Sequence, residues 1–145
     1  MRELELDDYK KGIMELMGQM THIDAHHTYD QFAIFYENYK RQSSLIIVEE
    51  VDGKIVATGK IIIEPKMSYG FRKVGHIEDI VVDDKYRGKG YGRKIVDFLV
   101  GYGICNNCYK IILNCSDDNV AFYSKCGFVR KCNQMSMLVP KMSMI

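Results

Sequence analysis

One stretch of the sequence, residues 75–97, constrains the fold more than any other (GHIEDIVVDDKYRGKGYGRKIVD). It begins with a β-branched apolar run that predicts a buried strand, formed by Ile77, Ile80, Val81 and Val82. A turn rich in glycine and basic residues follows, and apolar residues then recur at helical spacing, which predicts a helix over about residues 90–102. Glycines let backbone N–H groups approach a ligand, and a helix N-terminus presents unpaired donors with a positive dipole. The turn at residues 87–92 is therefore predicted to bind an anion.

Two adjacent carboxylates, Glu78 and Asp79, interrupt the apolar run. Neighbouring residues of a regular strand point to opposite faces, so one of the two should face an interior or a cleft unless a bulge changes the alternation. The alternative interpretation is that both lie at a sheet edge, beside glycines that form an ordinary loop. A glycine-rich loop alone does not decide between the two.

Length and composition are those of an ordinary globular domain. The 145 residues suit one domain, residues 1–145, with enough chain for a sizeable core. The formal net charge of +1 argues against bulk electrostatic binding of nucleic acid or membranes. No apolar run is long enough to span a bilayer and no signal peptide is recognisable, so we expect a cytoplasmic protein with neither kind of partner.

Cysteines and histidines give no sign of a metal or redox centre. Five cysteines, an odd number, fit reduced thiols better than a disulfide framework. Cys105 and Cys108 form a CxxC, but no second pair stands at ligand spacing, and the motif precedes a predicted strand instead of opening a helix. The histidines form no HExxH or comparable ligand pattern: His22, His26, His27 and His76. The sequence therefore predicts no metal site.

Apolar spacing and turn signals predict the other elements. Before the central stretch we expect a strand at residues 2–6, a helix capped by Asp7 or Asp8 and ending near Met20, a helix starting at Thr28 or Asp30, and strands at 45–51 and 55–63 joined at Asp52-Gly53. The aromatic side of the second helix is predicted to be core: Phe32, Phe35, Tyr36 and Tyr39.

After the central stretch we expect a strand at residues 109–114, a helix at 119–125 ended by Gly127, and two short strands within 128–139. A strand, a helix and a strand in succession imply parallel pairing through a right-handed crossover. The predicted fold class is therefore α/β with a mixed sheet.

These motifs resemble the GNAT superfamily of N-acetyltransferases. The acyl-CoA turn of that superfamily has the form [QR]xxGx[GA], which RGKGYG at residues 87–92 fits at every fixed position. The P-loop pattern is missing, and no second mononucleotide half supports a dinucleotide site. Blocks at residues 57–64, 75–82, 108–115 and 119–128 resemble the members that acetylate glucosamine 6-phosphate, whereas the N-terminal third matches only in layout.

The resemblance implies a central mixed, twisted sheet of about six to seven strands flanked by about four helices. It also implies acetyl-CoA as cosubstrate and a homodimer, and the apolar residues of the segment 135–139 independently favour an interface between copies of the chain.

The resemblance assigns cofactor binding to the turn, the end of the preceding strand and the late helix: Ile80, Val81, Val82, Arg87, Gly88, Lys89, Gly90, Tyr91, Gly92, Asn119 and Tyr123. Backbone N–H groups near residues 80–82 are expected to polarise the thioester oxygen. Tyr123 is expected to protonate the leaving thiolate; without the resemblance it reads as a packed helix tyrosine.

Contacts with an amino sugar phosphate are implied for Lys66, Met67, Ser68, Tyr69, Glu78, Asp79, Ile80 and Asn114. Glu78 and Asp79 match the carboxylates that hold the substrate ammonium, and they join Tyr123 as the expected catalytic residues. Lys66 is placed near the 6-phosphate, with a solvated loop lysine as the alternative.

Two departures from the family pattern affect the acceptor side. Asn114 replaces an acidic residue, and because an amide cannot act as a base, Glu78, Asp79, Asp117 or water must take that role. The basic residue that members carry near the C-terminus is missing from residues 135–139. The remaining candidates for the phosphate are Arg72, Lys73, Arg130 and Lys141.

Two alternatives stay open at this stage. One is a GNAT enzyme that acetylates another small amine or a protein amine, and the other is a non-catalytic acyl-CoA-binding module. Turnover with a panel of amines separates the first from the main hypothesis, and CoA binding without turnover would support the second.

Overall fold

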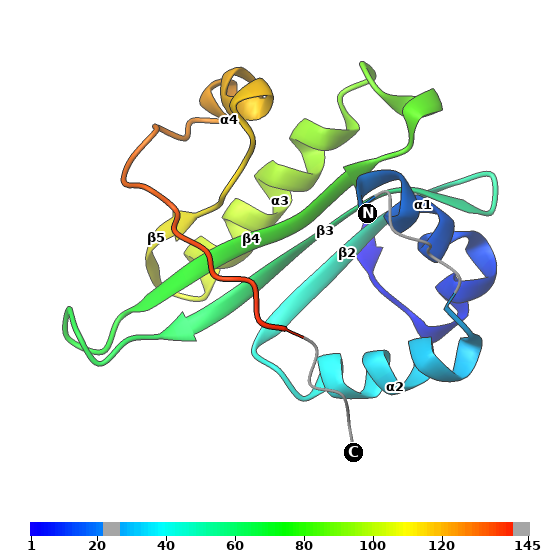
Figure 1. Cartoon of the computed structure of the whole chain (residues 1–145), viewed down its shortest axis with the longest axis horizontal. Helices are drawn as coiled ribbons and strands as arrows, with labels where there is room; N and C mark the ends of the chain where they lie inside the picture. The colour runs from blue at the N-terminus through cyan, green and yellow to red at the C-terminus, as the bar shows by residue number, and fades with distance from the viewer. Residues whose placement is uncertain (22–26, 141–145) are drawn as a thin grey trace. The chain divides into compact units, whose positions relative to one another are not determined.

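The computed structural model describes residues 1–21 and 27–140, which fall into two compact units, Met1–Leu113 and Asn114–Ile145. The first unit holds nearly all of the regular structure (Figure 1). Its elements are β1 (Arg2–Glu3), the 3₁₀ helix η1 (Leu6–Lys11), α1 (Ile13–Thr21), α2 (Tyr29–Lys40), β2 (Ser44–Val51), β3 (Lys54–Pro65), β4 (Lys73–Val82), η2 (Asp84–Tyr86), α3 (Tyr91–Cys105) and β5 (Cys108–Ile112).

The sheet has the order β1-β2-β3-β4-β5, with antiparallel pairs up to β4 and a parallel β4–β5 pair. This arrangement confirms the mixed α/β sheet and the parallel crossover through α3. Asp52 and Gly53 both have positive φ, 50° and 78°, as the predicted two-residue hairpin turn requires.

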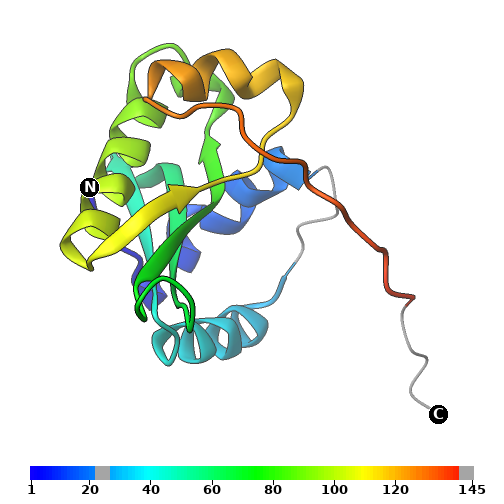
Figure 2. The ribbon, with the colours of Figure 1, turned by 90° about the vertical axis from the view of Figure 1, so that its left-hand side faces the viewer.

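Helices cover both faces of the sheet (Figure 2). α3 packs against β3, β4 and β5, and α1 packs against β3 and β4 on the other face. Gly59 is required where β3 packs against side chains of α3 and β4, since a Cβ there would lie 2.5 Å from Ile80 Cδ1 and 2.6 Å from Ile95 Cγ2. The core cluster on the α1 face is formed by Leu4, Ile13, Leu16, Phe32, Tyr39, Ile46, Val48, Ile55 and Val81.

The single helix predicted for this region is two separate helices in the structure. Gly12 adopts a left-handed φ of 83° and separates η1 from α1, and Glu5 precedes η1 as its N-cap instead of Asp7 or Asp8. Thr28 does cap α2, because its hydroxyl accepts from the Gln31 N–H at 3.3 Å.

The second unit contains η3 (Asp117–Asn119) and α4 (Val120–Lys125), followed by Gly127 with a φ of 94°. Residues 128–139 contain no strand, so the prediction of two final strands is wrong, and the sheet has five strands in the part of the chain described instead of six or seven. A strand depends on a neighbour to pair its backbone groups, and a sequence pattern does not specify that neighbour.

A buried ion pair ties the N-terminus to η1. The Asp8 carboxylate has no solvent exposure, and Arg2 donates to its two oxygens at 2.8 and 2.6 Å. Burial alone would raise the pKa of Asp8, but the Arg2 hydrogen bonds, the Glu5 N–H and the charge of Lys11 outweigh burial and leave that pKa lowered.

Replacing Asp8 with asparagine should lower the free energy of unfolding by about 2 kcal/mol at neutral pH, the usual scale for hydrogen bonds to charged groups. Because the folded pKa of Asp8 lies below its unfolded value of 3.8, its contribution is complete above that pH and is lost as the pH falls toward the folded pKa. Urea unfolding at neutral and acid pH measures both effects. An Asp8→Asn variant as stable as the wild type at neutral pH would contradict this account.

Candidate active site

A β-bulge interrupts β4 at the predicted carboxylate pair. Thr58 pairs with Val81 and Lys60 pairs with Glu78, so Gly59 of β3 stands opposite both Asp79 and Ile80. Asp79 has a φ of 55°, a left-handed conformation that costs energy for any residue other than glycine. A bulge was the one exception to the prediction that Glu78 and Asp79 point to opposite faces of the sheet, and β4 contains such a bulge.

The bulge places both carboxylates on one face of the sheet. Asp79 lines a cavity on the α1 side, and Glu78 lies opposite Lys60, which lines the same cavity. Both side chains are exposed, so neither carboxylate is directed into the interior. The prediction that one of them faces an interior or a cleft is met only by Asp79, through the cavity that it lines.

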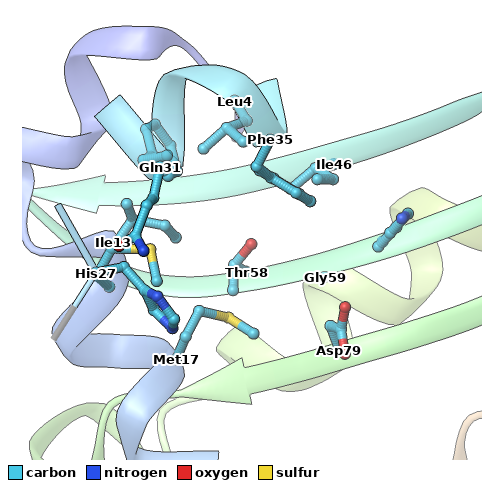
Figure 3. Close-up of a pocket in the computed structure, with 13 residues that line it drawn as sticks. Leu4, Ile13, Met17, His27, Gln31, Phe35, Ile46, Thr58, Gly59 and Asp79 are labelled. Carbon is cyan, nitrogen blue, oxygen red and sulfur yellow. The ribbon is translucent and has the colours of Figure 1, made fainter. Parts of the chain in front are cut away.

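This cavity has a volume of about 300 Å³ and lies between α1, α2 and the sheet (Figure 3). Its polar lining consists of His27, Gln31, Thr58, Lys60 and Asp79. Its remaining walls come from Leu4, Ile13, Met14, Met17, Phe32, Phe35, Ile46 and Gly59. Sequence reasoning had selected only Asp79 from this set as a site residue, because the others come from separate elements.

The aromatic stripe of α2 is divided between the core and the cavity. Phe32 and Tyr39 are buried, as predicted, and Tyr36 is partly buried against the same cluster. Phe35 is 45% exposed and lines the cavity, so the core prediction is wrong for that residue.

Only the first part of β4 pairs with β5, and this leaves one edge of β4 open beside the bulge. The last pair that the described strands form is His76 with Ile112. β4 continues to Val82, so backbone groups of residues 77–82 that point toward the β5 side have no strand partner within the described chain. The backbone N–H groups among residues 80–82 that face this edge are suited to bind an acceptor atom of a ligand.

The glycine turn follows directly at the end of β4. Gly88 and Gly90 have φ values of 73° and 86°, and a Cβ at either position would meet nothing within 4 Å. Backbone conformation, and not packing, therefore calls for glycine at both positions. Gly90 is the N-cap of α3 and supplies no side-chain cap, so the first N–H groups of this long helix, from Tyr91 and Gly92 onward, are open to a ligand.

The basic side chains of the turn are partly engaged within it. Arg87 donates from Nε to the Val82 carbonyl at 3.2 Å, and its Nη2 lies 2.8 Å from an Asp84 oxygen. Lys89 Nζ lies 5.0 Å from the Tyr86 ring centre. Both basic residues are exposed, so an incoming anion can reach them.

Residues 66–69 lie at the opposite end of β4 from the glycine turn, since Pro65 pairs with Lys73. Lys66 is not a free loop lysine, because its Nζ lies 2.7 Å from Glu64, whose other oxygen lies 2.6 Å from His76 Nε2. The Lys66 and His76 hydrogen bonds lower the pKa of Glu64.

The rest of this loop is exposed. Met67 and Tyr69 are 89% and 70% exposed, and Ser68 beside them is exposed as well. Tyr69 also packs against Tyr109, with ring centres 5.0 Å apart and ring planes tilted by 32°.

The second unit holds the other predicted site residues. Tyr123 on α4 packs its ring against Phe122 and Phe128. Burial, with smaller effects from Cys115 and Cys126, raises the pKa of Tyr123, so its hydroxyl stays protonated at neutral pH. Asn119 donates to the Ser116 hydroxyl at 3.3 Å.

Other candidates for the acceptor side are now placed. Asn114 is exposed, and Asp117, a possible base, lies 3.2 Å from Arg130, a possible phosphate ligand. Arg72 stacks on the Tyr109 ring at 5.2 Å, and Lys73 begins β4. Lys141 lies outside the described residues, as do His22 and His26.

Residues 1–21 and 27–140 contain neither a cluster of metal-binding side chains nor a helix able to cross a membrane. No group of three or more His, Cys, Asp or Glu side chains in these ranges is arranged to hold a metal ion. None of the helices in these ranges is long and apolar enough to cross a membrane. No disulfide bond joins any of the five cysteines, all of which lie in the described residues.

A bulged strand with an open edge, continued by a glycine turn and a helix N-terminus, defines an acyltransferase of the GNAT class. Residues 3–128 match the acetyltransferase (GNAT) family, and the chain belongs to this family.

Several relatives of this chain are glucosamine 6-phosphate N-acetyltransferases. The chain is 43% identical over 139 residues to the glucosamine 6-phosphate N-acetyltransferase of Arabidopsis thaliana, covering 93% of each chain. It is 44% identical over 143 residues to glucosamine 6-phosphate N-acetyltransferase 1 of Dictyostelium discoideum, covering 96% of this chain and 90% of that one. The crystal structure of glucosamine-6-phosphate N-acetyltransferase from Arabidopsis thaliana superposes with a TM-score of 0.89, covering 96% of this chain and 97% of that one at 43% identity.

Proposed function

We propose that this chain transfers the acetyl group of acetyl-CoA to the amine of D-glucosamine 6-phosphate, giving N-acetylglucosamine 6-phosphate and CoA, in the route to UDP-N-acetylglucosamine. The observation that carries the proposal is the bulge at Asp79, which brings two carboxylates to one face beside the open edge of β4. The acceptor is supported by the 43% and 44% identity with proteins named for this substrate.

The residues around the glycine turn fit the pyrophosphate of CoA. Gly88 and Gly90 leave open space where a side chain would stand, and uncapped N–H groups of α3 provide donors. Arg87 and Lys89 add positive charge. The thioester then lies along the open edge at residues 80–82, where backbone N–H groups stabilise the oxyanion that develops during attack.

Glu78 and Asp79 hold the substrate ammonium, and the neutral amine attacks the thioester carbon directly in a ternary complex. The ammonium first gives one proton to a carboxylate or to water. The C–N bond then forms as the C–S bond breaks, and the nitrogen loses a second proton, which balances the proton that the thiolate takes up. Tyr123 donates a proton to the departing thiolate, for which its raised pKa keeps it protonated. Lys66, with Met67, Ser68 and Tyr69 beside it, is the proposed contact for the phosphate end.

Initial rates measured while both substrates are varied test this mechanism. Intersecting double-reciprocal lines are expected from a ternary complex, and mass spectrometry should find acetylated amino sugar phosphate and an unmodified enzyme. Parallel lines with an acetylated protein would overturn direct attack.

One observation favours a second class of acceptor. The cavity beside Asp79 is lined mainly by apolar side chains, which suit the body of an apolar amine better than a sugar phosphate. An apolar primary amine is therefore the alternative acceptor to test.

Asn114 should contribute to acceptor binding more than to the chemical step. Asn114→Ala is expected to raise the KM for glucosamine 6-phosphate more than it lowers kcat, as happens when a binding contact is lost. Asn114→Asp should remain active, because it restores the acid that the family carries. A fall in kcat with an unchanged KM in the alanine variant would instead assign the amide a role in the transition state.

We propose a homodimer that covers the apolar residues of the segment 135–139. Met135, Met137, Leu138 and Val139 are 94%, 88%, 95% and 82% exposed, a row of apolar side chains that water would otherwise contact. Sedimentation velocity should show a dimer at micromolar concentration, and Leu138→Asp should shift it toward monomer. A wild-type monomer at that concentration would contradict the proposal.

The cytoplasmic location and the lack of nucleic-acid and membrane partners stay predictions.

A further inference from the structure

A buried aspartate that the proposed mechanism does not use lies where β4 ends. Asp83 is only 2% exposed. Its Oδ2 accepts hydrogen bonds from Lys54 Nζ at 2.9 Å and from Gln19 Nε2 at 3.3 Å, and its Oδ1 accepts from the Lys85 N–H at 2.9 Å. The carboxylate thus joins the β2–β3 hairpin, α1 and η2.

Backbone hydrogen bonds fix the same segment. The Asp83 N–H donates to the Val56 carbonyl at 2.8 Å, and the Asp83 carbonyl accepts from the Tyr86 N–H at 2.8 Å. Gln19 also accepts, through Oε1, from the Asp84 N–H at 3.0 Å. The chain that leaves β4 is therefore held firmly before the glycine turn begins.

The two glycines of the turn contribute no packing contacts of their own. Side chains are missing at Gly88 and Gly90, and nothing lies within 4 Å of where their Cβ atoms would be. Such a turn keeps its shape only if both ends are fixed. α3 fixes one end, and the Asp83 network fixes the other.

We propose that Asp83 is a positioning residue for the CoA-binding turn, with Lys54 and Gln19 holding its carboxylate in place. The inference rests on the proposed binding of acetyl-CoA by residues 87–92. Backbone donors must point at the pyrophosphate when it arrives, and small displacements of such groups weaken binding strongly. Gln19 lies on α1, which also lines the cavity through Met14 and Met17, so one helix contacts both parts of the site.

A merely structural role for Asp83 makes a different prediction, and the chain offers a matched control. Asp8 is likewise buried and hydrogen-bonded to a basic side chain, but its partners Arg2, Lys11 and the Glu5 N–H belong neither to the turn nor to the Asp83 network. If burial of an ion pair were all that mattered, both aspartates would affect stability alike and neither would affect CoA binding selectively.

CoA dissociation constants measured by calorimetry, with thermal midpoints for each variant, decide between the two. Asp83→Ala should weaken CoA binding about tenfold or more, since misplaced donors lose most of their contribution. Asp83→Asn should lose less, because its amide oxygen can still accept from the Lys85 N–H. Asp8→Asn should lower the midpoint and leave CoA affinity unchanged. Unchanged affinity in Asp83→Ala, or an equal loss in Asp8→Asn, would overturn the proposal.

Two further measurements keep the test decisive. If Asp83→Ala does not fold, Lys54→Ala and Gln19→Ala each remove one hydrogen-bond partner of the Asp83 carboxylate. Both variants should also bind CoA more weakly than the wild type. Unchanged CoA affinity in both would overturn the proposal. Amide hydrogen exchange over residues 84–92 is measured without ligand. It should be faster than in the wild type in each folded variant of Asp83, Lys54 or Gln19, and it should be unchanged in Asp8→Asn. A wild type that binds no CoA would refute the proposed function, whereas the exchange rates would still decide on the role of Asp83.

Discussion

Tyr123→Phe is expected to lower kcat by about 10²-fold, the usual scale for loss of a general acid. The substitution removes only the hydroxyl, and the ring contacts with Phe122 and Phe128 remain, so folding should be unaffected. Because the raised pKa keeps the hydroxyl protonated at neutral pH, loss of the Tyr123 proton should lower the wild-type rate in alkaline solution, through a limb that the variant lacks. Pre-steady-state thiol release measures the chemical step directly.

The control for this prediction is Tyr102→Phe on α3, where a partly buried tyrosine has no assigned role. Its rate should equal that of the wild type. Full activity in Tyr123→Phe would contradict the role of Tyr123 as a general acid and would mean that Tyr123 serves only to pack α4.

Gly90→Asp should lose at least tenfold in affinity for CoA, which corresponds to about 1.4 kcal/mol. An aspartate there adds a side chain and a negative charge where the backbone must approach the pyrophosphate. Calorimetric titration with CoA gives the dissociation constant of the folded variant.

Strain from the positive φ must be separated from this effect. Gly70→Asp is the matched control, because Gly70 also has a positive φ, 67°, and equally open surroundings. Gly70 lies at the other end of β4, away from the glycine turn. Its CoA affinity should be that of the wild type. Equal losses in both variants, or no loss in Gly90→Asp, would contradict the assignment of the turn to CoA.

Local patterns were enough to predict most elements of the first unit. The strand at β4, the glycine turn and the start of α3 follow from residues that act within a few positions of one another, and so does the Asp52-Gly53 hairpin. The break at Gly12 was missed because glycine is tolerated within a helical pattern, and only packing decides that it ends η1.

The candidate site was predictable only in part. Glu78 and Asp79 could be selected from the sequence. They lie on the same face of the sheet because Gly59 of β3 stands opposite two residues of β4 instead of one. That pairing is a tertiary choice that no pattern within β4 reveals. The cavity was missed for the same reason, because α1, α2 and β3 each contribute single residues such as Met17, Gln31 and Lys60.

Thiol release from acetyl-CoA over a panel of amines tests the central claim most directly. The panel contains glucosamine 6-phosphate, glucosamine, a polyamine, an apolar primary amine and a lysine peptide. The account predicts that kcat/KM is highest for glucosamine 6-phosphate and that removing the phosphate lowers it. A higher value for any other amine would contradict the proposed acceptor, and CoA binding without turnover on any of them would contradict catalysis itself.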